Sequence, residues 1–145
     1  MKRDYGIYHV GFKILLRKGN RFLFLKSASK KYWDLPGGRA DNIEYKTPIK
    51  KIIEREVKEE LGDKARYNLG KIVFQYRRYS PNRKIYVFTT VYEAEYLSGE
   101  IKLSPEHSSY EWIDPKDYKF KEKEFCSKED FKEEYLAFKE YLKFK

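Results

Sequence analysis

The pattern of apolar and polar residues changes along the chain from strand-like to helix-like and back. Residues 10–17 and 21–26 are apolar, β-prone runs separated by three turn-forming residues, which predicts a β-hairpin. A helix is predicted further on, with Thr47 as its N-cap and Pro48 at its first position. Helical spacing of apolar residues supports this helix, and Gly62 is expected to end it. These apolar residues are Ile49, Ile52, Ile53, Val57 and Leu61.

The second half of the chain contains more strand-like patterns. Residues 67–79 and 84–96 are β-prone and predict a second hairpin. Residues 101–103 and 110–113 are expected as two short strands. Asp114-Pro115 marks a turn and is a candidate start for a short helix.

The C-terminal segment predicts an amphipathic helix that is capped by Ser127. Its apolar stripe, which we expect in the core, consists of Phe131, Tyr135, Phe138 and Leu142. Strands, a helix, more strands and a helix in this order predict an α+β fold. We therefore expect one domain over residues 1–145, an α/β/α sandwich in which a mixed β-sheet is flanked by helices on both faces.

The composition limits the compartment and the partners. Apolar residues make up 41% of the chain and charged residues 38%, above the roughly 25% of an average soluble protein, so the chain is globular and richly charged. Its formal net charge of +9 favours anionic partners such as nucleotides, nucleic acid or acidic lipid without selecting one. No apolar run approaches the roughly 20 residues of a membrane span, Met1-Lys2-Arg3-Asp4-Tyr5 lacks the apolar stretch of a signal peptide, and Cys126 is the only cysteine. We expect a cytoplasmic protein with no disulfide and no membrane partner.

Three carboxylates share one face of the first predicted helix. Glu56, Glu59 and Glu60 are three and four residues apart, so their side chains are neighbours. Unpaired like charges at this spacing cost a few tenths of a kcal/mol per pair, and a divalent cation would remove that cost. Hard cations such as Mg²⁺ prefer oxygen ligands, completed by water and substrate phosphates. The preceding Pro36-Gly37-Gly38 predicts a tight turn whose backbone can approach a metal or a phosphate.

These residues, taken in order, resemble the signature of the Nudix hydrolase family. Gly38, five further residues and Glu44 are followed by residues 55–62 (REVKEELG), which match the glycine, glutamate and Arg-Glu…Glu-Glu positions of that signature. Residues 33–38 (WDLPGG) and 106–114 (EHSSYEWID) are also typical of the family. The resemblance therefore spans most of the chain and implies the Nudix fold.

The chain departs from the family pattern at two positions. Ten residues separate Glu44 from Arg55 where the family has seven, and we expect the extra three mainly in the loop before the helix. Asp63 stands where an aliphatic residue is usual. The resemblance also implies that Arg55 pairs with Glu44 and braces this loop, although the insertion weakens that expectation.

The resemblance implies a cation site and a general base. Glu56, Glu59 and Glu60 are expected to bind Mg²⁺, with Mn²⁺ as a substitute and the Gly38 carbonyl as a further ligand. The cation would bridge them to the pyrophosphate and lower the pKa of the attacking water. The base is either Glu59 or Glu106, and Glu106 is alternatively a metal ligand or an ordinary loop residue. His107 next to it is expected to be structural.

Substrate contacts are predicted from residue type and position. Arg39 follows the glycines and is expected to meet a phosphate. Three further arginines could hold phosphates bidentately, but we expect them to be solvated at a hairpin tip: Arg77, Arg78 and Arg83. Aromatic candidates for stacking on a base are Trp33 and Tyr79, with Tyr32 and Tyr76 as alternatives. In the family, a tyrosine some sixteen to eighteen residues beyond the signature accompanies dinucleoside polyphosphate cleavage, and Tyr79 lies sixteen beyond Asp63.

The resemblance implies a pyrophosphohydrolase that acts on a small nucleoside diphosphate derivative. Nucleoside triphosphates, nucleotide sugars, ADP-ribose, dinucleoside polyphosphates and capped RNA are all compatible with the sequence. The main alternative is a non-catalytic module that binds a nucleotide or RNA, but the complete carboxylate set favours an enzyme. A purely structural protein leaves the acidic cluster unexplained. A homodimer is compatible with the family, but no exposed stripe identifies an interface.

Overall fold

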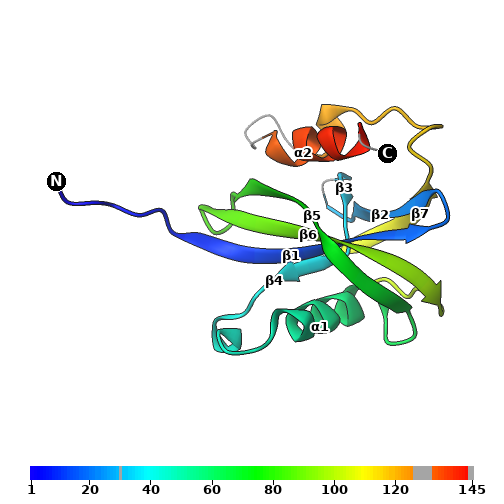
Figure 1. Cartoon of the computed structure of the whole chain (residues 1–145), viewed down its shortest axis with the longest axis horizontal. Helices are drawn as coiled ribbons and strands as arrows, with labels where there is room; N and C mark the ends of the chain where they lie inside the picture. Colours follow the sequence, from blue (N-terminus) through cyan, green and yellow to red (C-terminus); the bar gives the residue numbers. More distant parts are fainter. Residues whose placement is uncertain (30, 126–131, 144–145) are drawn as a thin grey trace.

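The computed structural model describes residues 1–29, 31–125 and 132–143, which form a mixed β-sheet with an α-helix on each face (Figure 1). At its centre β1 (Tyr8–Lys18) runs parallel to β6 (Ile85–Ser98). The main path through the sheet is β3-β2-β1-β6-β5, while β4 pairs with β1 and β7 with β2. The remaining strands are β2 (Arg21–Ser27), β3 (Trp33–Asp34), β4 (Gly37–Arg39), β5 (Arg66–Ser80) and β7 (His107–Ile113). The predicted fold class is thus confirmed.

Both predicted hairpins are present. β1 and β2 pair antiparallel only near their turn, at Arg17–Phe22 and Lys18–Arg21, because β4 pairs with β1 at residues 11–13. β5 and β6 pair antiparallel over nearly their whole length, with register shifts between Arg66 and Phe74. The insertion of β4 beside β1 places the Gly37-Gly38 turn against the middle of the sheet.

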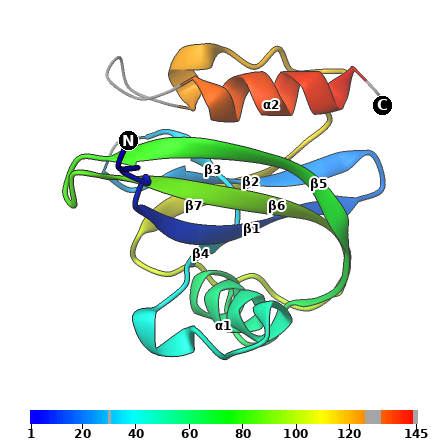
Figure 2. The same ribbon diagram turned by 60° about the vertical axis from the view of Figure 1, so that its left-hand side comes forward.

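The first helix, α1 (Ile49–Leu61), covers one face of the sheet, opposite α2 (Figure 2). Its N-cap is Pro48 and makes no side-chain capping bond, so the predicted Thr47 cap is wrong by one residue. Pro48 has ψ 138°, an extended conformation that delays the helix start. The helix ends at Gly62 as predicted, and φ 89° there favours glycine. Its buried apolar side chains are Ile52, Ile53, Val57 and Leu61.

Packing of α1 on the sheet is testable at Ile53, whose side chain is fully buried beneath the helix. The substitution Ile53→Val is expected to lower the free energy of unfolding by about 0.5–1.5 kcal/mol, because it leaves a methyl-sized cavity. Denaturant unfolding measures this change. Ile49→Val, one turn earlier and 46% exposed, is the matched control and should lie closer to wild type. An equal loss in the two variants would contradict the packing described.

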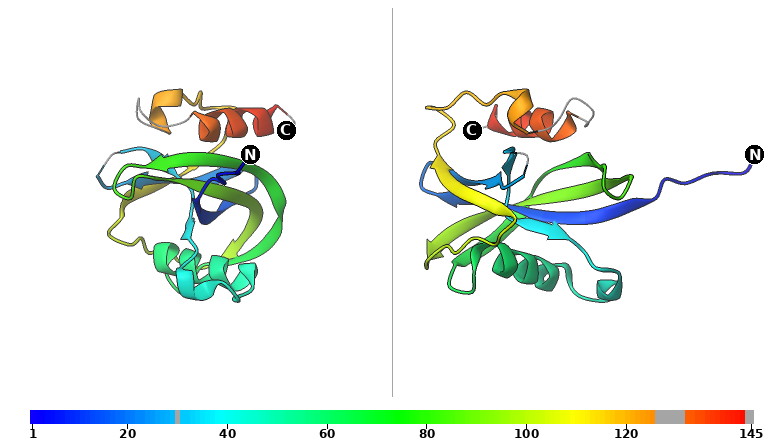
Figure 3. Two further views of the ribbon diagram at one scale, coloured as in Figure 1. Left: turned by 90° about the vertical axis from the view of Figure 1, so that its left-hand side faces the viewer. Right: turned by 180° about the vertical axis from the view of Figure 1, so that it is seen from behind.

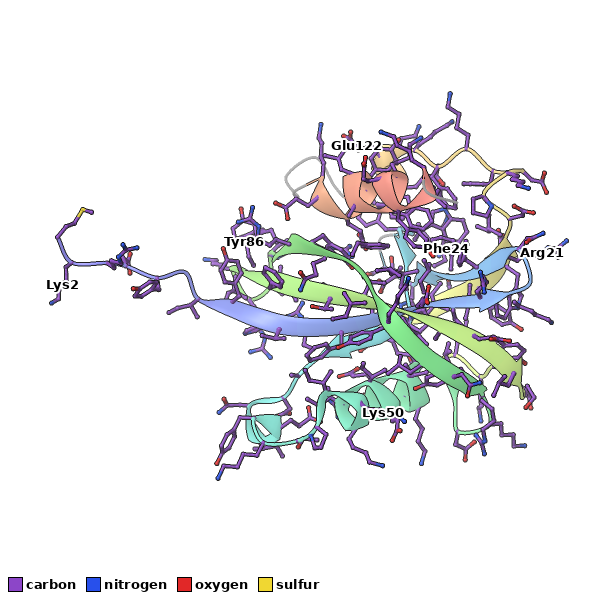
Figure 4. All side chains as sticks on the ribbon, in the orientation of Figure 1. Lys2, Arg21, Phe24, Lys50, Tyr86 and Glu122 are labelled. Atoms are coloured by element: carbon purple, nitrogen blue, oxygen red, sulfur yellow. The ribbon has the colours of Figure 1, made fainter. Side chains whose placement is uncertain are left out.

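The second helix, α2 (Glu133–Leu142), packs over the other face of the sheet. Its Phe138 contacts Phe24 of β2 with ring centroids 5.4 Å apart, and Figure 4 shows Phe24 between sheet and helix. Ion pairs also join it to β5: Arg77 with Glu133 at 2.6 Å, and Arg78 with Glu134 at 3.6 Å. Aromatic packing against the sheet and two ion pairs with β5 therefore hold this helix in place. The predicted cap Ser127 and stripe residue Phe131 lie outside the described residues.

Two expectations for the C-terminal half need correction. Residues 101–103 are not a strand, because the Lys102 N–H donates to the Leu61 carbonyl at the end of α1 rather than to a sheet edge. Asp114-Pro115 begins a turn but no helix, and the next helical element is the 3-10 helix η2 (Glu122–Glu124). Residues before β1 extend away from the sheet (Figure 3). Within the described ranges, none of the helices has the length and apolar character that a membrane crossing requires.

Candidate active site

A cavity of about 560 Å³ opens where β1, β4, β5, β6, α1 and the loop before β7 meet. Four glutamates line it: Glu56, Glu59 and Glu60 from α1, and Glu106 from the loop. Arginines line it too: Arg39 is the last residue of β4 and Arg78 lies on β5. The cavity therefore combines an acidic helix face with guanidinium groups.

The three carboxylates on α1 differ in exposure because the helix leans on the glycine turn. The Glu59 side chain is 59% exposed and that of Glu56 14%, while Glu60 is buried at 6%. Gly38 lies directly against Glu56, since a Cβ atom at residue 38 would come 2.2 Å from a Glu56 carboxylate oxygen. Only glycine lets this turn approach the helix so closely.

Arg55 contacts three carboxylates from one position. Its Nε donates to Glu44 Oε2 at 2.7 Å and its Nη2 to Glu44 Oε1 at 2.6 Å, so the predicted pairing is present as a bidentate contact. Its Nη1 donates to Glu56 at 2.9 Å and to Glu59 at 3.2 Å. Hydrogen bonds to Glu44 raise the pKa of Arg55, and the same bonds lower the pKa of Glu44. The guanidinium thus holds both Glu56 and Glu59 and ties them to the loop.

Sequence reasoning missed the residue beneath the glycine turn, Lys13 of β1. Its Nζ donates to the carbonyl oxygens of Leu35 at 3.1 Å and Gly37 at 3.2 Å, and lies 3.2 Å from Asp34 Oδ1. The Gly37 N–H in turn donates to Glu60 at 3.2 Å. Lys13 therefore fixes the turn that positions Glu60. The available signal was a lysine within the apolar run of residues 10–17.

Burial and mutual charge shift the pKa values of this group. Burial raises the pKa of Glu60 to about 7, opposed by the Lys13 ammonium and reinforced by the Asp34 charge. Burial also raises the pKa of Asp34, but Lys13 and His107 outweigh it and the pKa is lowered. For Lys13 the effects have opposite signs: burial lowers its pKa, but the charges of Asp34 and Glu60 outweigh burial, so the pKa is raised. Lys13 and Asp34 are therefore a charged pair, whereas Glu60 titrates near neutrality in the absence of a cation.

The turn before β7 brings two predicted residues to the acidic helix. Glu106 is exposed and lines the cavity, and its carbonyl accepts a hydrogen bond from the Ala28 N–H at 2.9 Å. His107 is buried at 7%, and its Nε2 lies 3.2 Å from Asp34 Oδ2. One ligand atom from each of Glu60, Glu106 and His107 lies within 4.8 Å of the others.

Trp33 does not occupy the position predicted for it. The ring is 4% exposed, packs on Phe24 and Tyr118, and donates from Nε1 to Glu124 at 2.8 Å. It does not line the cavity, because β3 directs it into the core on the α2 side. Trp33 is therefore a core residue, and the expectation that it stacks on a base is corrected. Tyr32 does not line the cavity either.

Other predicted substrate contacts do line the cavity. Arg39 is held at its rim by Ser80, whose Oγ accepts from Nη2 at 3.1 Å. Burial and the charges of Arg83 and Arg78 lower the pKa of Arg39, so these three guanidinium groups lie near one another. Tyr79 is half-buried on the lining, with its ring centroid 5.0 Å from that of Tyr86. Tyr76 also lines the cavity, but it is 3% exposed and belongs to the core.

The acidic residues fit a divalent cation. Glu56 and Glu60 are carboxylates whose burial raises their pKa values, so each gains from a cation nearby. Their neighbours Glu59 and Glu106 supply further oxygen ligands, the type that Mg²⁺ and Mn²⁺ take. A helix that presents carboxylates to a polar cavity beside a glycine turn fits a cation-dependent hydrolase of phosphate compounds.

Comparison with known proteins identifies the family. The family model described as NUDIX domain matches residues 7–133. The chain therefore belongs to the Nudix family, and it is a hydrolase that acts on acid anhydrides. Nudix hydrolases depend on divalent metal ions and act on small nucleotide substrates. No curated protein matches the chain.

Solved structures agree with this assignment. A MutT protein from Methanosarcina mazei Go1 is 27% identical, with a TM-score of 0.64, over 79% of this chain and 83% of that chain. A MutT NUDIX hydrolase from Burkholderia pseudomallei is 25% identical, with a TM-score of 0.63, over 79% and 89% of the two chains. A UDP-X diphosphatase, 14% identical with a TM-score of 0.66 over 99% and 67%, shares the fold.

Proposed function

We propose that this hydrolase cleaves the phosphoanhydride bond of a nucleoside diphosphate linked to another group, with Mg²⁺ as its cation and Mn²⁺ as a substitute. One observation carries the proposal: a single cavity unites the α1 carboxylates with Arg39 and Arg78. Its volume of about 560 Å³ suits a small nucleotide, since ligand pockets span roughly 300–1,000 Å³. Carboxylate-bound cations and arginines are both groups that proteins use to hold phosphates.

The proposed ligands are Glu56, Glu59 and Glu60, with the Gly38 carbonyl beside them. A bound divalent cation would neutralise phosphate charge and make water a better nucleophile at neutral pH. The water oxygen forms a bond to one phosphorus while the bridging P–O bond breaks, and the water proton passes to a carboxylate. Glu59 and Glu106 are the candidates for this base, since both line the cavity and are exposed. Arg39 would balance the charge on the departing phosphate group.

The nucleoside end of the substrate is proposed to lie against Tyr79. Its half-buried ring on the cavity wall can stack on a base, a contact that contributes about 1–3 kcal/mol. Candidate substrates are nucleoside triphosphates, nucleotide sugars, ADP-ribose and dinucleoside polyphosphates. UDP-linked compounds join the set because one structural relative is a UDP-X diphosphatase.

A substrate panel with product analysis tests the proposal. Purified protein is incubated with each candidate and with capped RNA, in Mg²⁺, in Mn²⁺ and with a chelator, in ¹⁸O-labelled water. The expected result is metal-dependent cleavage of one class into two phosphorylated products, one of which carries a single ¹⁸O atom. If a folded, cation-binding protein cleaved none of these substrates, the result would instead favour a module that binds nucleotides without cleaving them.

The role of Arg55 gives a separate prediction. Arg55→Lys removes the planar fork that holds Glu44, Glu56 and Glu59 together, because an ammonium is a single point charge. We expect the Mg²⁺ concentration needed for half-maximal activity to rise about 10- to 100-fold, as for other residues that orient metal ligands. Arg66→Lys is the control, since Arg66 does not line the cavity and donates to the carbonyl oxygens of Asp63 and Ala65. An unchanged Mg²⁺ requirement would refute this role.

A further inference from the structure

The cavity and α2 lie on the same face of the sheet. Side chains along a strand alternate between the two faces, and Tyr76 and Arg78 of β5 are two residues apart. Tyr76 lines the cavity and also belongs to the aromatic core that contains Phe138 of α2. Arg78 lines the cavity next along this face and forms an ion pair with Glu134, in the first turn of α2. The helix therefore reaches a residue of the cavity wall.

Glu134 is a carboxylate at a position where an amphipathic helix would place an apolar side chain. It is 4% exposed, and its Oε1 lies 3.6 Å from Nη1 of Arg78. The same oxygen makes no hydrogen bond within the described ranges. Burial raises the pKa of Glu134, while the Arg78 charge and a hydrogen bond from Tyr76 oppose this rise. A buried carboxylate is costly unless a partner compensates its charge, so Arg78 is the group that this carboxylate serves.

Arg78 also lies near a second buried anion. Its charge acts on Asp34, which Lys13 already holds at 3.2 Å. A guanidinium released by Glu134 would be drawn toward Asp34, at the edge of the glycine turn. Arginine binds phosphate through a planar fork of N–H groups, so its orientation matters as much as its charge. A fixed anion behind Arg78 would preserve that orientation.

We propose that Glu134 is a positioning residue, which holds the Arg78 guanidinium at the cavity wall so that Arg78 binds a phosphate of the substrate. The Arg78 side chain is 27% exposed and so remains accessible from the cavity while it is paired. The C-terminal helix would then complete the site through one ion pair. This inference rests on the proposed function, since it takes the substrate to carry linked phosphates.

Calorimetric titration of the full chain with methylenediphosphonate, in saturating Mg²⁺, tests the proposal. This probe keeps the linked phosphates that all candidate substrates share. Glu134→Gln preserves the shape of the side chain and is expected to weaken probe binding about tenfold, which corresponds to the loss of one hydrogen bond to a charged group. Removal of a negative charge would by itself favour an anion. Weaker binding therefore reports lost orientation rather than changed charge.

The matched control is Glu133→Gln, one residue earlier on the same helix. Glu133 pairs with Arg77 at 2.6 Å, and Arg77 does not line the cavity. The same charge is lost, but probe binding should equal that of wild type or be slightly tighter. If Glu134→Gln proves unstable, Glu134→Met repeats the measurement with an apolar side chain of similar length in the buried position.

A double variant shows whether Glu134 acts through Arg78. Arg78→Met is expected to weaken probe binding, and addition of Glu134→Gln to it should cause no further loss. A further loss, or a folded Glu134→Gln protein that binds the probe at least as tightly as wild type, would overturn the positioning role and leave the proposed function intact. A wild-type chain that neither binds the probe nor cleaves any substrate of the panel would overturn both.

Discussion

Replacing Glu60 by glutamine is expected to lower the turnover number about 100- to 1,000-fold while the protein stays folded. Glu60 is the carboxylate shared by the α1 face and the Glu106 turn, and the Gly37 N–H holds it in place. Glutamine keeps the shape but removes the negative charge that a divalent cation requires. Loss of a cation contribution of several kcal/mol to the transition state corresponds to this factor. Steady-state kinetics at saturating Mg²⁺ measures it.

The matched control for this prediction is Glu54→Gln. Glu54 lies on the same helix, is 44% exposed at its side chain and pairs with Lys51 outside the cavity. The chemical change is the same, so helix and charge effects cancel between the two variants. Glu54→Gln should retain turnover close to wild type. If Glu60→Gln retained it as well, the carboxylates of α1 would not be the cation site.

Replacing Lys13 by methionine is expected to lower the free energy of unfolding by about 3–5 kcal/mol. The side chain is 15% exposed and donates to two carbonyls as well as facing Asp34, so its removal leaves a part-buried carboxylate and two acceptors without their partner. Denaturant unfolding measures the loss. The turn that holds Glu60 should loosen too, so the Mg²⁺ requirement of the remaining folded protein should rise.

Two controls isolate the charge of Lys13 from its size. Lys50→Met changes an exposed lysine on α1 and should stay within about 0.5 kcal/mol of wild type. The double variant Lys13→Met with Asp34→Asn should cost less than the sum of its single variants, because the second change removes the unpaired charge. Additive losses, or a Lys13→Met protein as stable as wild type, would show that the pair of Lys13 and Asp34 does not brace the turn.

The spacing of apolar residues predicted those elements in which apolar side chains recur at a regular helical or strand period. The apolar spacing over residues 49–61 is that of a helix, and α1 has those bounds, with only the cap displaced by one residue because Pro48 is extended. Residues 101–103 have a strand-like pattern, but the Lys102 N–H donates to the Leu61 carbonyl at the end of α1 instead of to a strand. Partners of this kind are decided by tertiary structure and leave no trace in a short window of sequence.

Site residues were predictable where the chain itself brings them together. Glu56, Glu59 and Glu60 share a helix face at fixed spacing, which needs no knowledge of the fold. Lys13 and Asp34, in contrast, lie on two different strands, β1 and β3, which are far apart in sequence and approach each other only in the folded structure. Trp33 lies one residue before Asp34, yet alternation along β3 sends its ring to the opposite side, into the aromatic core.

The most direct test of the cation-dependent mechanism is anomalous X-ray diffraction from crystals soaked with Mn²⁺ and a diphosphate analogue whose bridging oxygen is replaced by methylene. The account predicts at least one manganese peak bounded by Glu56, Glu59 and Glu60, beside the Gly38 carbonyl, with the analogue's phosphates reaching Arg39. Manganese absent from this helix face at saturating concentration, with the analogue bound elsewhere, would contradict the account.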